Sequence, residues 1–380
     1  MRAVLAARPR KGLLPFFMQT IHSDRLDRLR RSIDASGADA LLVSHLPNVF
    51  YLCGFTGSHA ALLVFPREAH LFTDGRYTLQ ARQESSGARV HIGRQAAAAQ
   101  AGKLIALRKR RGRLRLGFDP TQLTQAEWTR LRAATGGGVR WKALAGLVEN
   151  LREIKSPAEL EAMRRAAKLG SEVMKEVLSL VKPGVTELQL AAEADYRMRR
   201  KGAAGPAFET IVASGVRSAL PHARPTEKCL QKNELVVIDL GAILRHYCSD
   251  LTRTVYLGRA PARVRRWYRA VEEAQQAALQ ALQAGQPAGK VDRAARRVLE
   301  RYRLGRFFIH STGHGLGTEV HEGPRLGRGQ KQEIRVGNVV TLEPGIYVEG
   351  VGGIRIEDDV AVHASGTEVL TNAPRGLLEL

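Results

Sequence analysis

At 380 residues and 44% apolar content, the chain exceeds what one hydrophobic core usually organises, so we expect two domains. No apolar run approaches the roughly 18 to 20 residues that cross a bilayer, which excludes an apolar helical membrane span. The net charge of +22 would attract polyanions, but the basic runs fall on amphipathic helix patterns without aromatic-interleaved readers, so we expect no specific nucleic-acid binding.

The chain opens with a basic and then briefly apolar sequence, MRAVLAARPRKGLLPFF. Its apolar part, LLPFF, is too short for a secretory signal and contains a proline. We therefore expect residues 1–20 to be a disordered extension, with a helix-rich beginning near Met18.

Residues 21–154 alternate helical and strand patterns. A helix over Asp24–Ser36 precedes a strand over Ala40–Ser44, and two further apolar runs follow, the second ending at Asp74. A helix, a strand and another helix come after Ala96. Alternation at this spacing predicts a layered α/β domain, and no residue in it has the spacing of a catalytic group.

A second domain is predicted to open at a sharp helix start. Ser156 can cap this helix, Pro157 suits its first position, and Glu159 completes a capping box. A second helix begins at Thr186, with Gln189 placed to close its own box. The domain boundary is therefore expected at about residue 155.

Residues 155–380, the expected C-terminal domain, contain this two-helix pattern twice. Helices over Arg263–Gln283 and Val291–Tyr302 are followed by strands, as the first pair is. Each half is therefore predicted to be two helices with an antiparallel strand set. A pseudo-twofold sheet with its helices outside would bring the ligands of both halves to a central seam.

Five acid and imidazole side chains stand out in this domain, each at a strand end or a glycine turn: Asp239, Asp250, His314, Glu343 and Glu357. Four hard oxygen donors and one imidazole suit a pair of divalent cations, Mn²⁺ first, with Co²⁺ or Zn²⁺ as alternatives. Two such cations can share and activate one water for attack on a carbonyl. The pattern therefore predicts a dinuclear metallohydrolase.

Each of these residues taken alone admits a structural interpretation. An Asp at a strand end is commonly a turn residue, a His beside glycines is often a loop histidine, and Arg355 with Glu357 on one strand face reads as a surface ion pair. Two antiparallel strands joined by a turn near Arg245 would, however, bring Asp239 and Asp250 to one face. The combination favours metal coordination, with Arg355 holding a ligand carboxylate in place.

With these motifs the chain closely resembles the M24 "pita-bread" metallopeptidases, and within them the Xaa-Pro aminopeptidases and Xaa-Pro dipeptidases (prolidases). The resemblance spans nearly all of residues 155–372, and two segments, PNVFYLCGFTGS (Pro47–Ser58) and LFTDGRYTLQARQE (Leu71–Glu84), resemble that family's N-terminal domain. The implied fold is a creatinase-like α/β domain over residues 21–154, followed by a C-terminal pita-bread domain with pseudo-twofold symmetry.

The resemblance implies a role for each ligand. Asp239 would chelate one cation, Asp250 and Glu357 would bridge both, and His314 and Glu343 would complete the other. Glu343 would also carry a proton from the activated water to the leaving proline nitrogen. The implied reaction is hydrolysis of the Xaa-Pro bond at the N-terminus of peptides or in Xaa-Pro dipeptides.

Three further histidines gain a role from the resemblance. His222, His310 and His321 are expected to contact the scissile peptide and to help stabilise the tetrahedral intermediate. Arg325, in the same segment as His321, could meet a substrate carboxylate bidentately, although an exposed structural arginine is an equal interpretation.

Two other functions stay open. A methionine aminopeptidase shares the fold and the five ligands, but it normally lacks a creatinase-like domain of this size, and GGIRIED resembles the proline-specific branch. A non-catalytic pita-bread protein could instead bind a protein or a nucleic acid, but such relatives tend to lose ligands.

The remaining expectations concern partners and compartment. The resemblance implies a peptide substrate with proline in second position and a homodimer, and no membrane partner is expected. The three cysteines are far apart and lack CxxC spacing, so the sequence predicts no disulfide framework and is typical of a reducing cytoplasm.

Overall fold

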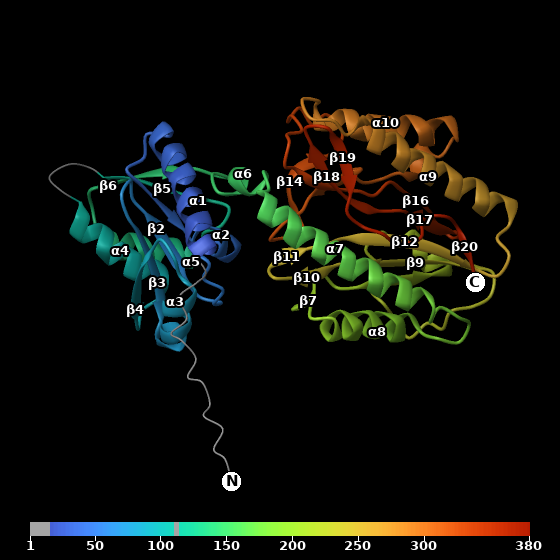
Figure 1. The fold of residues 1–380 in the computed structure, drawn as a ribbon, viewed down its shortest axis with the longest axis horizontal. Helices are drawn as coiled ribbons and strands as arrows, with labels where there is room; N and C mark the ends of the chain where they lie inside the picture. The colour runs from blue at the N-terminus through green and yellow to red at the C-terminus, as the bar shows by residue number, and fades with distance from the viewer. Residues whose placement is uncertain (1–15, 110–113) are drawn as a thin grey trace, which may run out of the picture. The chain divides into compact units, whose positions relative to one another are not determined.

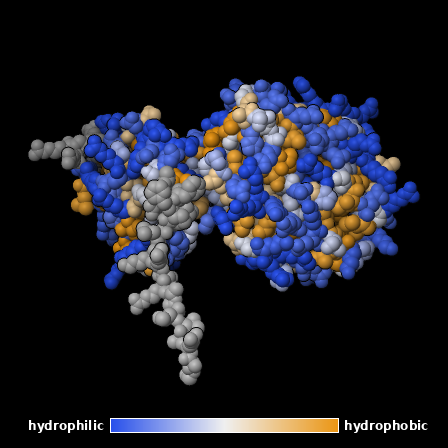
Figure 2. Space-filling model, in the orientation of Figure 1, coloured by the Kyte–Doolittle hydropathy of each residue, from blue (hydrophilic) through white to orange (hydrophobic). Residues whose placement is uncertain are grey.

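The computed structural model describes residues 16–109 and 114–380, so the expected extension lies outside the described residues as far as residue 15. The chain divides into two compact units, Met1–Arg152 and Glu153–Leu380 (Figure 1). No helix in the described ranges is long and apolar enough to cross a membrane. On the face of each unit that Figure 2 shows, hydrophilic residues predominate, as the composition leads one to expect.

The first unit is built on one mixed six-stranded sheet. Its strands are β1 (Ala40–Val43), β2 (Ala61–Val64), β3 (Ala69–Asp74), β4 (Arg89–Gly93), β5 (Leu114–Phe118) and β6 (Val139–Ala143). The order across the sheet is β4-β3-β2-β1-β5-β6. The β1–β2 and β2–β3 pairs are antiparallel, whereas β3–β4, β1–β5 and β5–β6 are parallel.

Helices cover both faces of this sheet. They are α1 (Phe16–Ala35), α2 (Leu46–Cys53), α3 (Thr78–Glu84), α4 (Ala97–Arg108), α5 (Gln125–Thr135) and α6 (Glu149–Arg152), with a 3-10 turn η1 (Gly75–Tyr77) before α3. Successive strand side chains point to opposite faces, so Leu41 packs with α1 and α2 while Leu42 packs with α4 and α5. The expected layered α/β domain is confirmed, although α1 begins at Phe16 and not at Asp24.

The four long helices of the second unit form two pairs. They are α7 (Pro157–Leu178), α8 (Glu187–Arg200), α9 (Ala262–Ala281) and α10 (Ala288–Arg301), and two 3-10 turns are η2 (Gly215–Ala219) and η3 (Gly305–Phe307). The capping boxes predicted at Ser156 and Thr186 are both present, and they fix the starts of α7 and α8.

The strands of the second unit make four small sheets. They are β7 (Gly205–Pro206), β8 (Ile211–Ser214), β9 (Glu234–Leu240), β10 (Ala242–Leu244), β11 (Tyr247–Cys248), β12 (Leu251–Leu257), β13 (Gly313–Gly315), β14 (Glu322–Leu326), β15 (Val339–Leu342), β16 (Gly345–Val348), β17 (Gly352–Arg355), β18 (Asp358–His363), β19 (Gly366–Val369) and β20 (Leu378–Glu379). The sheet orders are β11-β10-β7, β20-β12-β9-β8, β14-β13-β15-β18-β19 and β16-β17.

Each helix pair packs against its own sheet. Apolar residues of α7 and α8 form one core with β9 and β12, and those of α9 and α10 form another with β15 and β18. Helix α8 and the pair α9 and α10 lie on opposite sides of the strands (Figure 1). The predicted repeat of two helices with an antiparallel strand set is therefore present, with the strands of both halves between the helices.

All three cysteines of the chain are free. Cys53 and Cys248 are buried, whereas Cys229 is exposed. The prediction that the chain has no disulfide framework therefore agrees with the structure.

Candidate metal centre

The second unit contains a cavity of about 780 Å³ that gathers residues from both halves of the repeat. All ten residues suggested by the sequence line it: His222, Asp239, Asp250, His310, His314, His321, Arg325, Glu343, Arg355 and Glu357. The fold therefore brings the candidate site together, while the role of each residue stays a prediction.

Strand pairing places the first two acids. Strands β9 and β12 are antiparallel, with Asp239 opposite Thr252, and Asp250 directly precedes β12. The turn expected between these strands is confirmed, because Arg245 and His246 have φ angles of 50° and 70°. Both carboxylates consequently reach the same cavity.

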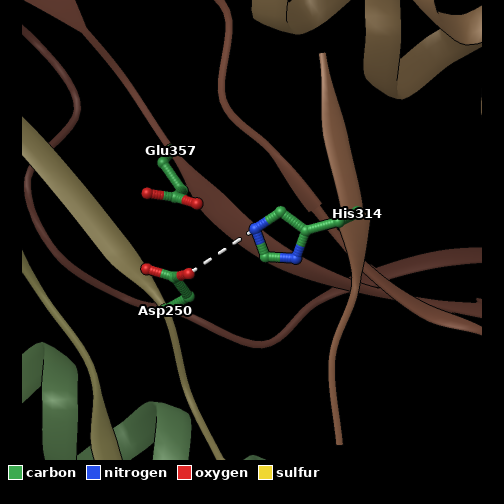
Figure 3. A group of neighbouring side chains, drawn as sticks. All are labelled: Asp250, His314 and Glu357. Atoms are coloured by element: carbon green, nitrogen blue, oxygen red, sulfur yellow. Dashed lines mark ion pairs between the residues drawn. The ribbon is translucent and has the colours of Figure 1, made fainter. Parts of the chain in front are cut away.

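Three of the five proposed ligands form a tight group. One potential ligand atom from each of Asp250, His314 and Glu357 lies within 4.8 Å of the other two. Figure 3 shows the two carboxylates facing the imidazole, with 3.8 Å between His314 Nε2 and Asp250 Oδ2. Glu343 adjoins this group, since its Oε1 is 3.4 Å from the same nitrogen.

Burial makes these acids unfavourable as free anions. Desolvation, followed by the charges of neighbouring carboxylates, raises the pKa of Asp250 and Glu357 well above the ordinary range. Burial also raises the pKa of Glu343. Asp239 Oδ1 and Asp250 Oδ1 are buried and accept no hydrogen bond from the described residues. Because buried anionic oxygens are costly without a cationic partner, this donor set fits a hard divalent cation.

Glycines position the imidazole of His314. A Cβ on Gly313 would collide with the carbonyl oxygen of Thr341, and one on Gly315 with that of Gly323, so β13 can lie between its neighbours only with glycine on both sides of the histidine. His314 Nδ1 is 3.0 Å from the Gly315 carbonyl oxygen. When Nδ1–H donates there, the Nε2 lone pair faces the carboxylates and is available to a cation.

Arg355 contacts a different candidate carboxylate from the one that the strand pattern suggested. It was expected to share a strand face with Glu357, but β17 ends at Arg355 and β18 begins at Asp358, so Glu357 lies between two strands of different sheets. The guanidinium instead donates to Asp239 Oδ2 at 2.5 Å and to Thr252 Oγ1 at 3.0 Å. Thr252 Oγ1 in turn donates to Glu357 Oε2 at 2.6 Å. Arg355 therefore contacts Asp239 directly and reaches Glu357 through a hydroxyl.

The three further histidines line the same cavity, and two of them adjoin the acid group. His310 Nδ1 lies 3.9 Å from Glu343 Oε2, and the ring of His321 meets that of His314 edge to face at 4.5 Å. Desolvation lowers the pKa of His310 and His321, which favours neutral imidazoles. His222 is exposed on the cavity wall.

Sequence reasoning missed a tyrosine that joins two of these groups. Tyr347 Oη is 2.9 Å from His310 Nε2 and accepts from Arg355 Nη1 at 2.9 Å. Burial raises the pKa of Tyr347 to about 12, so its hydroxyl stays protonated. The sequence did contain a signal for this tyrosine, because the segment YVEGVGGIR can be paired as a hairpin. That pairing places Tyr347 opposite Gly353 and Gly345 opposite Arg355, so Tyr347 and Arg355 lie on one face of the hairpin.

Two further lining residues carried no motif. Glu209 and Arg224 form an exposed ion pair at 3.1 Å on the cavity wall. Neither stands at a strand end or a glycine turn that would have marked it.

Comparison with known protein families gives a match along most of the chain. Residues 161–364 match metallopeptidase family M24, and residues 25–154 match the creatinase/prolidase N-terminal domain. The chain belongs to metallopeptidase family M24.

Named relatives of this M24 peptidase cover nearly its full length. An Xaa-Pro dipeptidase of Pyrococcus horikoshii is 32% identical over 94% of this chain and 99% of its own. Among solved structures, an Xaa-Pro dipeptidase from Bacillus anthracis matches with a TM-score of 0.89 at 34% identity, over 94% of this chain and all of that one. An X-Pro aminopeptidase from Thermotoga maritima matches with a TM-score of 0.84 at 35% identity, over 93% and 100%.

These matches confirm the fold and the family expected from the motifs. This M24 peptidase has a creatinase-type α/β N-terminal domain followed by a pita-bread domain. Membership of a metallopeptidase family implies metal dependence, and the group of Asp250, His314 and Glu357 could hold a metal ion.

Proposed function

We propose that this M24 peptidase hydrolyses the Xaa-Pro bond, in Xaa-Pro dipeptides or at the N-terminus of longer peptides. The observation that carries the proposal is the buried acid and imidazole group on the wall of a cavity that three further histidines also line. Relatives named for Xaa-Pro dipeptidase and X-Pro aminopeptidase activity, at 32–35% identity over nearly the whole chain, support the choice of substrate.

The proposed ligands of two divalent cations are the five residues Asp239, Asp250, His314, Glu343 and Glu357. Mn²⁺ is the cation we favour, and Co²⁺ or Zn²⁺ also suit these donors. Cations in this site would supply an activated water for attack on the substrate carbonyl. The unused oxygens of Asp239 and Asp250 support this arrangement.

The chain's own groups then handle protons and charge. Glu343, whose pKa is raised by burial, is suited to accept a proton from the attacking water and to deliver it to the proline nitrogen. His321, neutral by desolvation, can donate its N–H to the oxygen on which negative charge develops. A neutral His310 donates its single N–H to the carbonyl oxygen of Ser311, so it would contact the scissile peptide without donating to that oxygen. His222 would contact the substrate from the opposite half of the repeat.

Proline specificity is tested by comparing kcat/KM for Ala-Pro and Ala-Ala in the metal-loaded enzyme. Burial of the ring's three methylenes at about 0.8 kcal/mol each contributes about 2 kcal/mol, so we expect about a thirtyfold preference. Equal rates would reject the proposal. A preference for N-terminal methionine without a demand for proline would favour a methionine aminopeptidase instead, and a protein without hydrolytic activity would favour a binding role.

A substitution of Arg325 can distinguish dipeptidase from aminopeptidase activity, because this residue is exposed on the cavity wall. If its guanidinium receives the carboxylate of a dipeptide, Arg325→Gln should raise KM for Ala-Pro by about tenfold and leave KM for Ala-Pro-amide unchanged. Arg328→Gln, at an exposed position that does not line the cavity, is the matched control. An equal effect on both substrates would remove Arg325 from carboxylate recognition.

The homodimer, the cytoplasmic location and the lack of specific nucleic-acid binding stay predictions. Each follows from the sequence and the resemblance described above.

A further inference from the structure

A buried carboxylate on α8 holds both ends of the segment that carries His222. Glu187 is fully buried, and its Oε1 accepts from the amide and the hydroxyl of Ser214, each at 2.8 Å. Its Oε2 accepts from the amide and the hydroxyl of Thr226 at 3.1 and 2.8 Å, and from Arg217 Nε at 3.1 Å. One side chain therefore closes residues 214–226 into a loop on the cavity wall.

A second buried carboxylate does the same for the segment that carries His310. Asp292, on α10, is fully buried and pairs with Arg296 through both carboxylate oxygens, at 2.7 and 3.1 Å. Its Oδ1 also accepts from the amide and the hydroxyl of Thr312 at 3.2 and 3.0 Å. Arg296 donates onward to the carbonyl oxygens of Phe308 and His310. The backbone is thus held on both sides of His310.

The two arrangements occupy corresponding places in the repeat. Glu187 and Asp292 each lie on the second helix of their half, and these helices lie on opposite sides of the strands (Figure 1). Each anion binds the backbone amide and the hydroxyl of a threonine in a cavity-lining segment. Each acid satisfies buried N–H and O–H donors that an apolar residue would leave unpaired, so both acids contribute to stability. Stability alone does not explain why both sets of donors belong to segments that line the cavity.

We propose that Glu187 and Asp292 are positioning residues that set the places of His222 and His310 against the substrate. The proposal rests on the proposed function, in which these histidines contact the scissile peptide. Displacing a catalytic group by about 1 Å can cost about a hundredfold in rate, so two anchors of this kind matter to turnover far more than to substrate binding.

The test uses Glu187→Gln and Asp292→Asn in the full-length, metal-loaded enzyme. Each amide keeps the shape of the side chain but presents an N–H₂ group where the carboxylate accepted hydrogen bonds. We expect kcat for Ala-Pro to fall by about 10- to 100-fold, with KM and metal content close to wild type. Amide hydrogen exchange should become faster in residues 214–226 of the first variant and in residues 308–312 of the second.

Glu159→Gln is the matched control. Like Glu187, Glu159 is a buried carboxylate in the first turn of a helix, and Ser156 and Tyr247, with which it forms hydrogen bonds, do not line the cavity. We expect this variant to keep wild-type kcat even if its melting temperature falls. An unchanged exchange rate in both segments, or a kcat equal to that of the control, would overturn the proposal. A wild-type enzyme that shows no preference for Ala-Pro would instead overturn the proposed function, and the exchange measurement would still decide whether the anchors hold the loops.

Discussion

Asp250 and Glu357 are buried acids of the cavity wall, at 5% and 2% exposure. If they bridge two cations, Asp250→Asn and Glu357→Gln should each lower the bound metal from about two ions per chain toward none, and activity with it. Metal analysis after reconstitution with Mn²⁺ measures this. Glu209→Gln is the control, because Glu209 is an exposed acid on the same wall. Full metal content in either bridge variant would remove that residue from the ligand set.

Substitution of His321 should weaken transition-state stabilisation without affecting metal binding. This histidine lies against His314 but offers its ring to the cavity, so His321→Ala should retain both cations while kcat falls by about 10²–10³. Steady-state kinetics and metal analysis on the same preparation measure the two effects. His321→Gln, which keeps an N–H donor, should recover part of kcat. A change confined to KM would mean that His321 only positions substrate.

Residue types and their local settings explain why the candidate ligands could be read from the sequence. Each one lies at a predicted strand end or a glycine turn, and the five occur together in one domain. Thr252 and Tyr347 carry no such mark, because a hydroxyl at their positions is ordinary. Their importance arises from contacts with Glu357 and His310, which are distant in the chain and adjacent only after folding.

At the scale of elements, strand β13 is the one with the least freedom to change. Gly315→Ala would drive a methyl group into the carbonyl of Gly323, which displaces His314 or separates β13 from β14. We expect stability to fall by about 1–3 kcal/mol and metal affinity to fall with it, measured by urea unfolding and by metal titration. Gly376→Ala is the control, because a Cβ there meets nothing within 4 Å. Normal metal affinity in Gly315→Ala would show that the strand can shift without moving the imidazole.

The two helix starts marked by capping boxes were the most predictable boundaries, since a box needs only residues three apart, and both predicted boxes are present. The start of α1, which no box was predicted to mark, lies eight residues before the expected Asp24. The segment GGIRIEDDVAV was the least predictable. It reads as one strand, yet β17 pairs with β16 and β18 pairs with β15, in different sheets. The break that places Glu357 in the cavity is set by those distant partners, so local periodicity could not reveal it.

For the whole molecule, two units with separate cores should respond differently to acid. Burial lowers the pKa of His22, in the first unit, from 6.5 to about 4, with Arg25 as a second cause. The folded state therefore prefers the neutral ring of His22. The contribution of this ring to the stability of the folded state is fully present above pH 6.5 and is lost as the pH falls toward 4, because the unfolded chain binds the proton first. From pH 7.5 to 5 we expect the first unit to lose about 2 kcal/mol from this group.

Urea unfolding followed by tryptophan fluorescence can isolate that loss. Trp128 and Trp141 report on the first unit, and Trp267→Phe removes the signal of the second. In His22→Gln the difference in stability between the two pH values should shrink by about 2 kcal/mol. If the variant and its parent lose equal stability on acidification, His22 is not the group that titrates.

The distribution of cysteines has a practical consequence. Burial raises the pKa of the Cys53 thiol to about 12, and Cys248 is buried as well, so a maleimide dye or spin label should attach to Cys229 alone. Cys229 lies three residues after the loop that Glu187 closes, and its backbone forms an isolated antiparallel β-bridge with Thr186 at the start of α8. The natural sequence thus offers a single addressable position for spectroscopy, from which motion of the His222 loop can be followed during turnover without engineering any cysteine.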